Sequence, residues 1–297
     1  SAGILLPSLR WQQRGRILAV SGCIIFAALS VVRSRVWADE FTLWGDAVRK
    51  GPHMSRAHLY LGNAHKDVAQ LERDPSVRNR HWRAADLAYG RAYEEARVLD
   101  LQLRALNNRG GVRLALGLGL FAQNRDLART EFVAAEEHFR AAVKRNPSYA
   151  DAIVNLGNVT IMSSRVASGT EEREDLLRRS IEYNFEALRL RPNHAQAHSN
   201  LGVAYQDLGE YDASERSYRH ALQLTPGDWL TMKNLATVLF LRSTQAISSG
   251  QHDVARQILE EAKSFVRRAL RLNPNVASGQ QVLEAIEARL QQLPQGG

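Results

Sequence analysis

Asparagine side chains recur at one position of a repeated sequence pattern, where their carboxamides could bind a peptide backbone. Each stands directly before an Arg-Gly, Leu-Gly or Leu-Ala pair, at Asn108, Asn155, Asn200 and Asn234. A carboxamide has one acceptor and two donors, so it can pair with the C=O and N–H of a peptide without reading the peptide's side chains. The same amides could instead form only local hydrogen bonds, and the sequence leaves both roles open.

Histidines and glycines give little support for metal binding or catalysis. His194 and His198 are four residues apart without a cysteine or carboxylate cluster, so we expect both to be structural and predict no metal site. The glycine pairs at 110–111 and 117–119 lack the preceding strand and the Lys-Ser/Thr of a phosphate-binding loop. Motifs such as Ser-x-x-Lys, Gly-x-Ser-x-Gly and His-Glu-x-x-His are absent. We therefore predict no catalytic residues, no cofactor and no enzymatic activity.

The composition is that of a folded, largely helical protein whose positive charge is dispersed. The 297 residues include only 8 prolines, which permits long helices, and carry a net charge of +8. Five of the 39 basic residues are lysines, and the arginines are interspersed with Asp and Glu instead of forming a block. This dispersal disfavours nucleic acid as a partner. The single cysteine, Cys23, excludes an internal disulfide framework.

The elements that position the asparagines are indicated by a second recurring pattern, Ala-x-x-x-x-Pro. It occurs at Ala47/Pro52, Ala142/Pro147, Ala187/Pro192, Ala221/Pro226 and Ala269/Pro274. A recurring unit of about 34 residues or more indicates a stacked array of repeats. Such arrays typically bind other molecules along a groove.

The clearest unit, residues 195–228, resembles the tetratricopeptide repeat (TPR), a helix-turn-helix of 34 residues. With Ala195 as position 1, Gly202 takes position 8, Tyr218 position 24 and Pro226 position 32. Glycine at position 8 lets the first helix, helix A, approach its neighbour, and the tyrosine fills the space between the helices. Proline ends the second helix, helix B. The resemblance implies an all-α fold, a right-handed TPR superhelix or α-solenoid.

Five TPR units are predicted over residues 55–275, and four of them carry extra residues between helix A and helix B. The insertions lie near 71–81, 118–128, 163–175 and 243–253. They predict loops or lengthened helices on one edge of the array, either as a second binding edge or as tolerated elaboration. A half-repeat helix is expected at 39–54, and residues 276–297 are expected to form a capping helix and a tail.

In TPR arrays the residues of helix A line a concave surface, so the resemblance also implies which residues face a ligand. The four recurring asparagines at position 6 are similar to the asparagine ladder of O-linked N-acetylglucosamine transferase, which grips a peptide backbone. Further groove candidates are Asn63 and Asn158 at position 9, with Gln206 and Asp207 in the fourth unit. The basic residues of the carboxylate-clamp subclass are not reproduced at position 5. The implied partner is a protein or peptide, and chain ends are disfavoured.

An uncharged apolar run before the repeats predicts a single membrane-spanning helix over about residues 17–36, surrounded by membrane lipid. Trp11 and Trp37 lie 26 residues apart, about 39 Å along a helix, which matches the separation of the two interfaces where Trp concentrates. A buried helix is the alternative, and arginines on both flanks leave the orientation undecided. The predicted anchor residues are Trp11, Arg16, Arg33, Arg35 and Trp37, within an anchoring segment at 1–38.

A second resemblance covers about 50 residues at the junction between the apolar run and the repeats. Residues 33–52, followed by Tyr60-Leu61-Gly62, are similar to the region where polytopic O-mannosyltransferases pass from their last membrane helix into C-terminal TPRs. In that family the catalytic residues lie in earlier membrane-proximal loops, which this sequence does not contain. The resemblance implies that the chain could be the substrate-binding tail of such an enzyme.

Two functions therefore remain open. The first is a membrane-anchored TPR adaptor, with the array close to the bilayer on one side, that binds a protein or is a subunit of a larger membrane assembly. The second is the substrate-binding TPR region of a membrane glycosyltransferase. An upstream reading frame with further hydrophobic spans and paired acidic residues would favour the second function, whereas a start codon near Ser1 would favour the first.

Overall fold

The computed structural model describes residues 21, 25–26, 30–31, 34 and 39–294, in which the regular structure is helical and no β-strand occurs. The all-α class predicted from the repeats is therefore confirmed for these residues. The helices are α2 (Glu40–Lys50), α3 (Ser55–Leu71), α4 (Pro75–Glu95), α5 (Leu99–Leu120), α6 (Arg125–Arg145), α7 (Ala150–Ser164), α8 (Thr170–Leu190), α9 (Ala195–Leu208), α10 (Tyr211–Leu224), α11 (Trp229–Ser248), α12 (His252–Leu272) and α13 (Ala277–Gln292).

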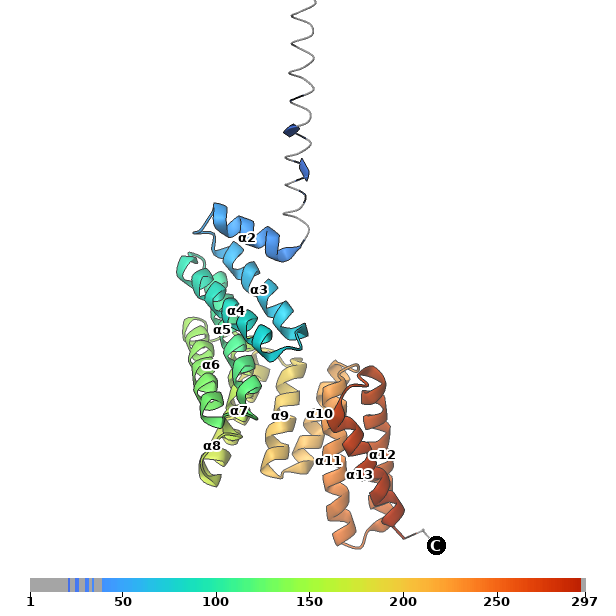
Figure 1. Ribbon diagram of the computed structural model, residues 1–297. Helices are drawn as coiled ribbons and strands as arrows, with labels where there is room; N and C mark the ends of the chain where they lie inside the picture. The colour runs from blue at the N-terminus through green and yellow to red at the C-terminus, as the bar shows by residue number, and fades with distance from the viewer. Residues whose placement is uncertain (1–20, 22–24, 27–29, 32–33, 35–38, 295–297) are drawn as a thin grey trace, which may run out of the picture. The chain divides into compact units, whose positions relative to one another are not determined.

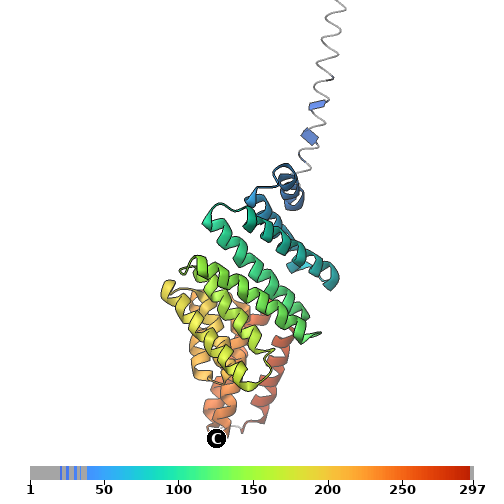
Figure 2. The same ribbon diagram turned by 90° about the vertical axis from the view of Figure 1, so that its left-hand side faces the viewer.

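The chain divides into two compact units, residues 1–105 and 106–297, and the division falls within α5. In unit 1, α3 and α4 pack against each other as an antiparallel pair, and α2 packs on α3 (Figures 1 and 2). Trp44 of α2 stacks on Tyr60 of α3, with the ring centroids 4.5 Å apart. α2 thus occupies the predicted half-repeat at 39–54, although the predicted domain boundaries themselves stay a prediction.

In unit 2, the pairs α7/α8, α9/α10 and α11/α12 follow one another, and α13 packs on α12 (Figure 1). The first helices of successive pairs also touch, because α7 contacts α9 and α9 contacts α11. This contact pattern brings the A helices of successive repeats together on one face. Gly209, which ends α9, adopts a left-handed conformation with φ 80°, where glycine is favoured.

Each of three helix pairs is closed by a glycine of helix A that meets an aromatic ring of helix B. A Cβ atom built on Gly62 would lie 2.6 Å from the ring of Tyr89, and one on Gly202 would lie 2.5 Å from the ring of Tyr218. Gly110 meets Phe139 in the same way, at 2.5 Å. Tyr89, Phe139 and Tyr218 are all fully buried. The close approach that the glycine pattern predicted is therefore present.

The extra residues between helices A and B lengthen the helices more than the loops. Helices α4, α6, α8 and α12 each contain 21 residues, whereas α9 and α10, in the repeat without an insertion, each contain 14. The intervening connections are short, as between Leu120 and Arg125. Of the two outcomes open from the sequence, lengthened helices are the one observed.

The predicted membrane span lies mostly outside the described residues, as do Trp11, Arg16, Arg33, Arg35 and Trp37. Among the helices that the structure describes, none combines the length and the apolar character needed to cross a bilayer. The transmembrane part of the predicted fold class is therefore without support from the described helices.

Candidate functional site

In unit 2, half-buried amides occur on the helices α5, α7, α9 and α11. Asn155 of α7 donates from Nδ2 to Oδ1 of Asn107 at 2.8 Å, and both side chains are half-buried. Asn158 lies about one turn further along α7, is half-buried, and has no side-chain hydrogen bond to any residue that the structure describes. Its two donors and its acceptor are therefore open to a ligand.

Asn200 differs from the other predicted ladder residues because its side chain is only 3% exposed. Its Nδ2 donates to the carbonyl of Val154 on α7 and to Oδ1 of Asn184 on α8, each at 3.2 Å. Its Oδ1 accepts from Nε2 of Gln196 at 2.9 Å. This amide joins two successive repeats, a role that the sequence did not indicate, and its contact with a peptide stays a prediction.

Two further predicted groove residues have polar partners within the protein. In unit 1, Oδ1 of Asn63 accepts from the hydroxyl of Tyr89 at 2.8 Å. In unit 2, Asn108 is half-buried on α5 and also has a partner in the chain. Whether either amide also reaches a ligand stays a prediction.

The fourth and fifth repeats place three predicted groove residues around one buried tyrosine. The hydroxyl of Tyr218 donates to Oε1 of Gln206 at 3.4 Å. Burial raises the pKa of Tyr218 strongly, the carboxylate of Asp207 raises it further, and a hydrogen bond with Asn234 lowers it. The hydroxyl therefore stays protonated and works as a neutral donor.

Two cations that sequence reasoning missed lie beside these residues. Arg165, at the end of α7, forms an ion pair from Nη2 to Oδ2 of Asp207 at 3.4 Å. Lys233 of α11 is half-buried, and its pKa is lowered, first by burial and second by the charge of Arg165. Lys233 stands at position 5 of its repeat and could be considered from the sequence. Arg165 lies in an insertion, which has no numbered position in the repeat pattern. We call Arg165, Gln206, Asp207, Tyr218, Lys233 and Asn234 the groove cluster.

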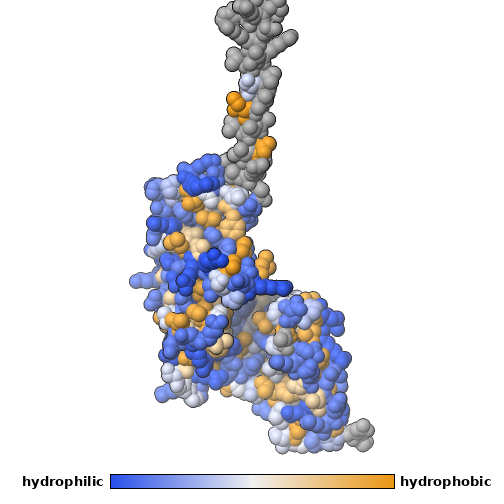
Figure 3. All heavy atoms as spheres, viewed as in Figure 1, coloured by the Kyte–Doolittle hydropathy of each residue, from blue (hydrophilic) through white to orange (hydrophobic). Residues whose placement is uncertain are grey.

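The groove cluster offers hydrogen-bond partners and a small excess of positive charge. Gln206 and Asn234 can each donate and accept, and two cations stand against the single carboxylate of Asp207. Figure 3 shows polar and apolar residues mixed over the visible surface of unit 2. This chemistry suits a peptide backbone, whose C=O and N–H groups need both kinds of partner.

The histidine pair considered from the sequence is engaged in local contacts. His194 lies 3.2 Å from Oδ1 of Asp151, and the ring of His198 stacks on His220 with centroids 4.1 Å apart. Within the part of the chain that the structure describes, no cluster of three or more His, Cys, Asp or Glu could hold a metal ion.

Comparison with sequence families identifies the fourth repeat. Residues 195–228 match the sequence model of the family described as tetratricopeptide repeat, which confirms the resemblance predicted for that segment. Among curated proteins, the chain is 25% identical over 99 residues to the Photosystem I assembly protein Ycf3 of Cyanophora paradoxa. That match covers 32% of this chain and 57% of the relative, so the chain spans little more than half of the relative's length.

Two solved TPR proteins have a similar arrangement of helices. A thermophilic TPR protein of Thermus thermophilus is 22% identical, with 78% of this chain and 99% of that chain covered and a TM-score of 0.56. A TPR protein from Parabacteroides merdae is 15% identical, with 90% and 98% covered and a TM-score of 0.50. At these identities the likeness establishes the fold alone.

Proposed function

We propose that this chain, which matches the tetratricopeptide repeat over residues 195–228 and has the helical fold of TPR proteins, is a protein-binding scaffold that holds an extended peptide segment along the A helices of unit 2. The observation that carries this proposal is the presence of half-buried amides on three successive A helices, Asn158 on α7, Gln206 on α9 and Asn234 on α11. Packed helices lie about 8–10 Å apart, and an extended peptide advances about 3.3 Å per residue. An extended peptide crossing the A helices would therefore reach the next A helix about every third residue.

The charges of the groove cluster set the preference among peptides. Arg165 and Lys233 favour carbonyl oxygens and acidic side chains, and Asp207 limits the net charge by pairing with Arg165 at 3.4 Å. Since amides read the backbone and not the side chains, the scaffold is expected to accept a range of sequences. Proteins with this fold bind proteins and peptides, which supports a non-enzymatic role.

A peptide library tests the proposal. Random peptides of about twelve residues, selected on the full chain, should bind in an extended form with a weak side-chain consensus. The double variant Asn158→Ala/Asn234→Ala should weaken the selected peptides at least about tenfold, equivalent to about 1.4 kcal/mol, because each amide loses its pairing with the backbone. Isothermal titration calorimetry measures this change.

The matched control replaces two exposed turn residues, as Asn193→Ala/Asn275→Ala. It removes the same number of carboxamides from unit 2 and should leave affinity within about twofold. Equal weakening by both double variants, or no weakening by the first, would contradict a groove that reads the backbone through these amides. Asn200 is left out of the design because its burial would confuse loss of binding with loss of folding.

The place of action is a separate part of the proposal. We propose that residues 17–36 anchor the chain in a bilayer by a single pass and that the repeats work close to that surface, as a subunit or assembly factor of a membrane complex. The uncharged run over residues 17–32 supports the anchor. The match to a photosystem assembly protein supports an assembly role, because that relative is named for such work.

Membrane extraction tests the anchor. The natural chain should stay with the membrane pellet after an alkaline wash, whereas Ile24→Lys/Ile25→Lys should move it to the supernatant, because charges at the centre of a span each cost about 2.5–3.5 kcal/mol. Exposed Val254→Lys is the control and should not change the partition. Release of the natural chain by the wash would refute the anchor and leave the peptide groove untouched.

A further inference from the structure

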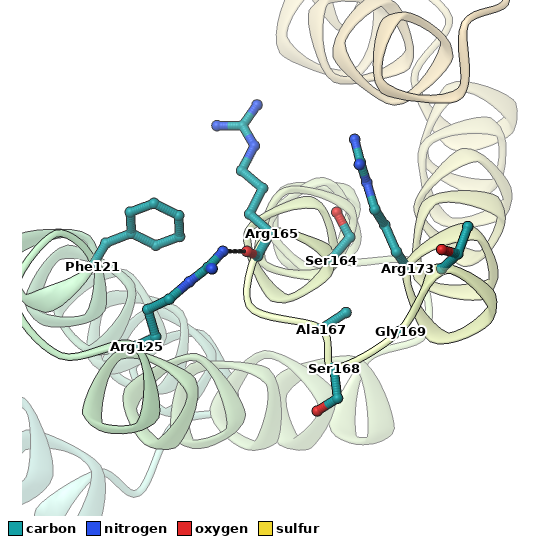
Figure 4. A pocket seen from close by; sticks show the side chains of 9 residues that line it. Phe121, Arg125, Ser164, Arg165, Ala167, Ser168, Gly169 and Arg173 are labelled. Atoms are coloured by element: carbon teal, nitrogen blue, oxygen red, sulfur yellow. Dashed lines mark hydrogen bonds between the residues drawn. The ribbon is translucent and has the colours of Figure 1, made fainter.

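We propose that an arginine-lined pocket at the insertion edge of unit 2 binds acidic side chains of a polypeptide partner. The pocket has a volume of about 490 Å³ and lies where the ends of α5 and α7 meet the beginnings of α6 and α8. We call it the edge pocket and define it by Phe121, Arg125, Arg165, Ser168, Thr170 and Arg173. Figure 4 shows the three arginines, one each from α6, α8 and the residue after α7.

The charges of the edge pocket are largely uncompensated. No carboxylate lines it, and in the described part of the chain neither Arg125 nor Arg173 has an ion pair. Arg125 donates instead to the carbonyl of Arg165, and Arg173 donates to the carbonyl of Asp207 at 3.4 Å. Only Arg165 has a carboxylate partner, Asp207. A carbonyl orients a guanidinium but leaves its full charge, so the pocket attracts an anion.

Two carboxylates in the first turn of α8 stand near the edge pocket without lining it. Glu172, in the first turn of α8, accepts from the backbone N–H of Ser168 at 2.7 Å and lies 3.6 Å from Nη2 of Arg129. Glu171 is exposed in the same turn. Neither carboxylate lines the pocket. An anion from outside the chain can therefore approach the guanidinium groups of Arg125 and Arg173, which have no carboxylate partner in the described part of the chain.

The shape and position of the edge pocket favour a carboxylate carried by a polypeptide. Arginine presents a planar fork of donors that fits a carboxylate through two hydrogen bonds. The ring of Phe121, 5.6 Å from the guanidinium carbon of Arg125, supplies an apolar wall for the methylene groups of a Glu side chain. Arg165 belongs to both the edge pocket and the groove cluster, so a segment lying in the proposed groove would continue into the pocket.

This inference rests on the proposed function in one respect, that the ligand is a polypeptide. It adds a second contact surface built by the insertion near 163–175, which ordinary repeats lack. Of the two roles that the sequence left open for the insertions, the proposal takes a binding edge at this repeat. The pocket differs from the groove in its chemistry. The pocket binds negatively charged side chains, whereas the groove binds the C=O and N–H groups of a peptide backbone.

The test uses a fluorescent peptide of alternating Glu and Gly and its Gln-for-Glu counterpart, with the full chain. Anisotropy should show the Glu peptide bound at least about tenfold more tightly than the Gln peptide at low ionic strength. The variant Arg125→Gln/Arg173→Gln should lose at least about tenfold of that affinity. The charge-matched control, Arg178→Gln/Arg189→Gln, removes two exposed arginines of α8 and should stay within about twofold.

Several outcomes would overturn the inference. Equal losses in the two arginine variants would indicate general attraction to a basic protein, and equal binding of the Glu and Gln peptides would remove the charge argument. Binding of a single-stranded oligonucleotide in place of the Glu peptide would assign the pocket to nucleic acid. Asn158→Ala/Asn234→Ala removes backbone contacts alone and should leave the ratio of Glu-peptide to Gln-peptide affinity within about twofold, so failure of the groove and failure of the pocket are distinguished. Circular dichroism confirms that each variant is folded, and Arg173→Gln alone is used if the double variant is not.

Discussion

Replacing Gly202 by alanine is expected to lower the free energy of unfolding by about 1–3 kcal/mol, because the new methyl group overlaps a buried ring. A Cβ atom at this position would lie 2.5 Å from Cδ1 and Cε1 of Tyr218. That ring is fully buried and cannot swing into solvent. Either α9 or α10 must therefore shift, which separates the two helices of the fourth repeat. Urea unfolding followed by circular dichroism measures the loss.

Gly111→Ala provides a matched control within the same unit. Gly111 is also a helical glycine, on α5, but it is exposed, and a Cβ atom added there would meet nothing within 4 Å. Alanine there should raise the free energy of unfolding by about 0.5–1 kcal/mol through helix propensity alone. If both substitutions stabilised the chain, close approach between α9 and α10 could not be the reason for glycine at position 8.

A double variant separates the overlap from other effects of the extra methyl group. Tyr218→Leu removes the ring and is expected to destabilise the chain on its own by leaving a cavity. In Gly202→Ala/Tyr218→Leu the alanine occupies part of that cavity, so the two losses should be less than additive. Additive losses would place the cost of Gly202→Ala outside the contact with Tyr218.

The repeat packing could be predicted from the sequence because its determinants are local and periodic. Position 8 and position 24 lie within one unit, so the contact between Gly202 and Tyr218 follows once the frame is fixed at Ala195. The frame holds in the first and second repeats, where Gly62 meets Tyr89 and Gly110 meets Phe139. The lengths of the helices were harder to predict, because the sequences of the insertions do not distinguish a loop from extra helical turns.

The candidate site could be predicted only in part, because burial of an amide depends on a neighbouring repeat. The third unit has Asn184 at position 24, where three other units have an aromatic ring. This smaller side chain is fully buried, and its Oδ1 faces Asn200 of the next repeat. The sequence around Asn200 contains no pattern that predicts a hydrogen bond with Asn184. The role of Arg165 was not predicted for a related reason, because its partner Asp207 lies 42 residues away in the sequence.

The Asn200→Ala variant is expected to lower the free energy of unfolding by about 1–3 kcal/mol, because it strands a buried acceptor. Oδ1 of Asn184 accepts from Asn200 at 3.2 Å, while the Asn184 amide donates to the carbonyl of Ser180 at 2.8 Å. Asn184 is fully buried, so water cannot replace the lost donor without opening the interface between the third and fourth repeats. Thermal and urea unfolding both measure this loss.

Asn155→Ala is the control variant that tests whether the loss of stability in Asn200→Ala comes from burial. Asn155 occupies the same repeat position, but it and its partner Asn107 are half-buried, so water can satisfy both and the loss should stay below about 0.5 kcal/mol. The double variant Asn184→Leu/Asn200→Ala removes acceptor and donor together and should recover part of the stability, because the buried Oδ1 of Asn184 is no longer left without a donor. Equal losses for Asn155→Ala and Asn200→Ala would show that position 6 contributes through its place in the repeat, and the argument from burial would then fail.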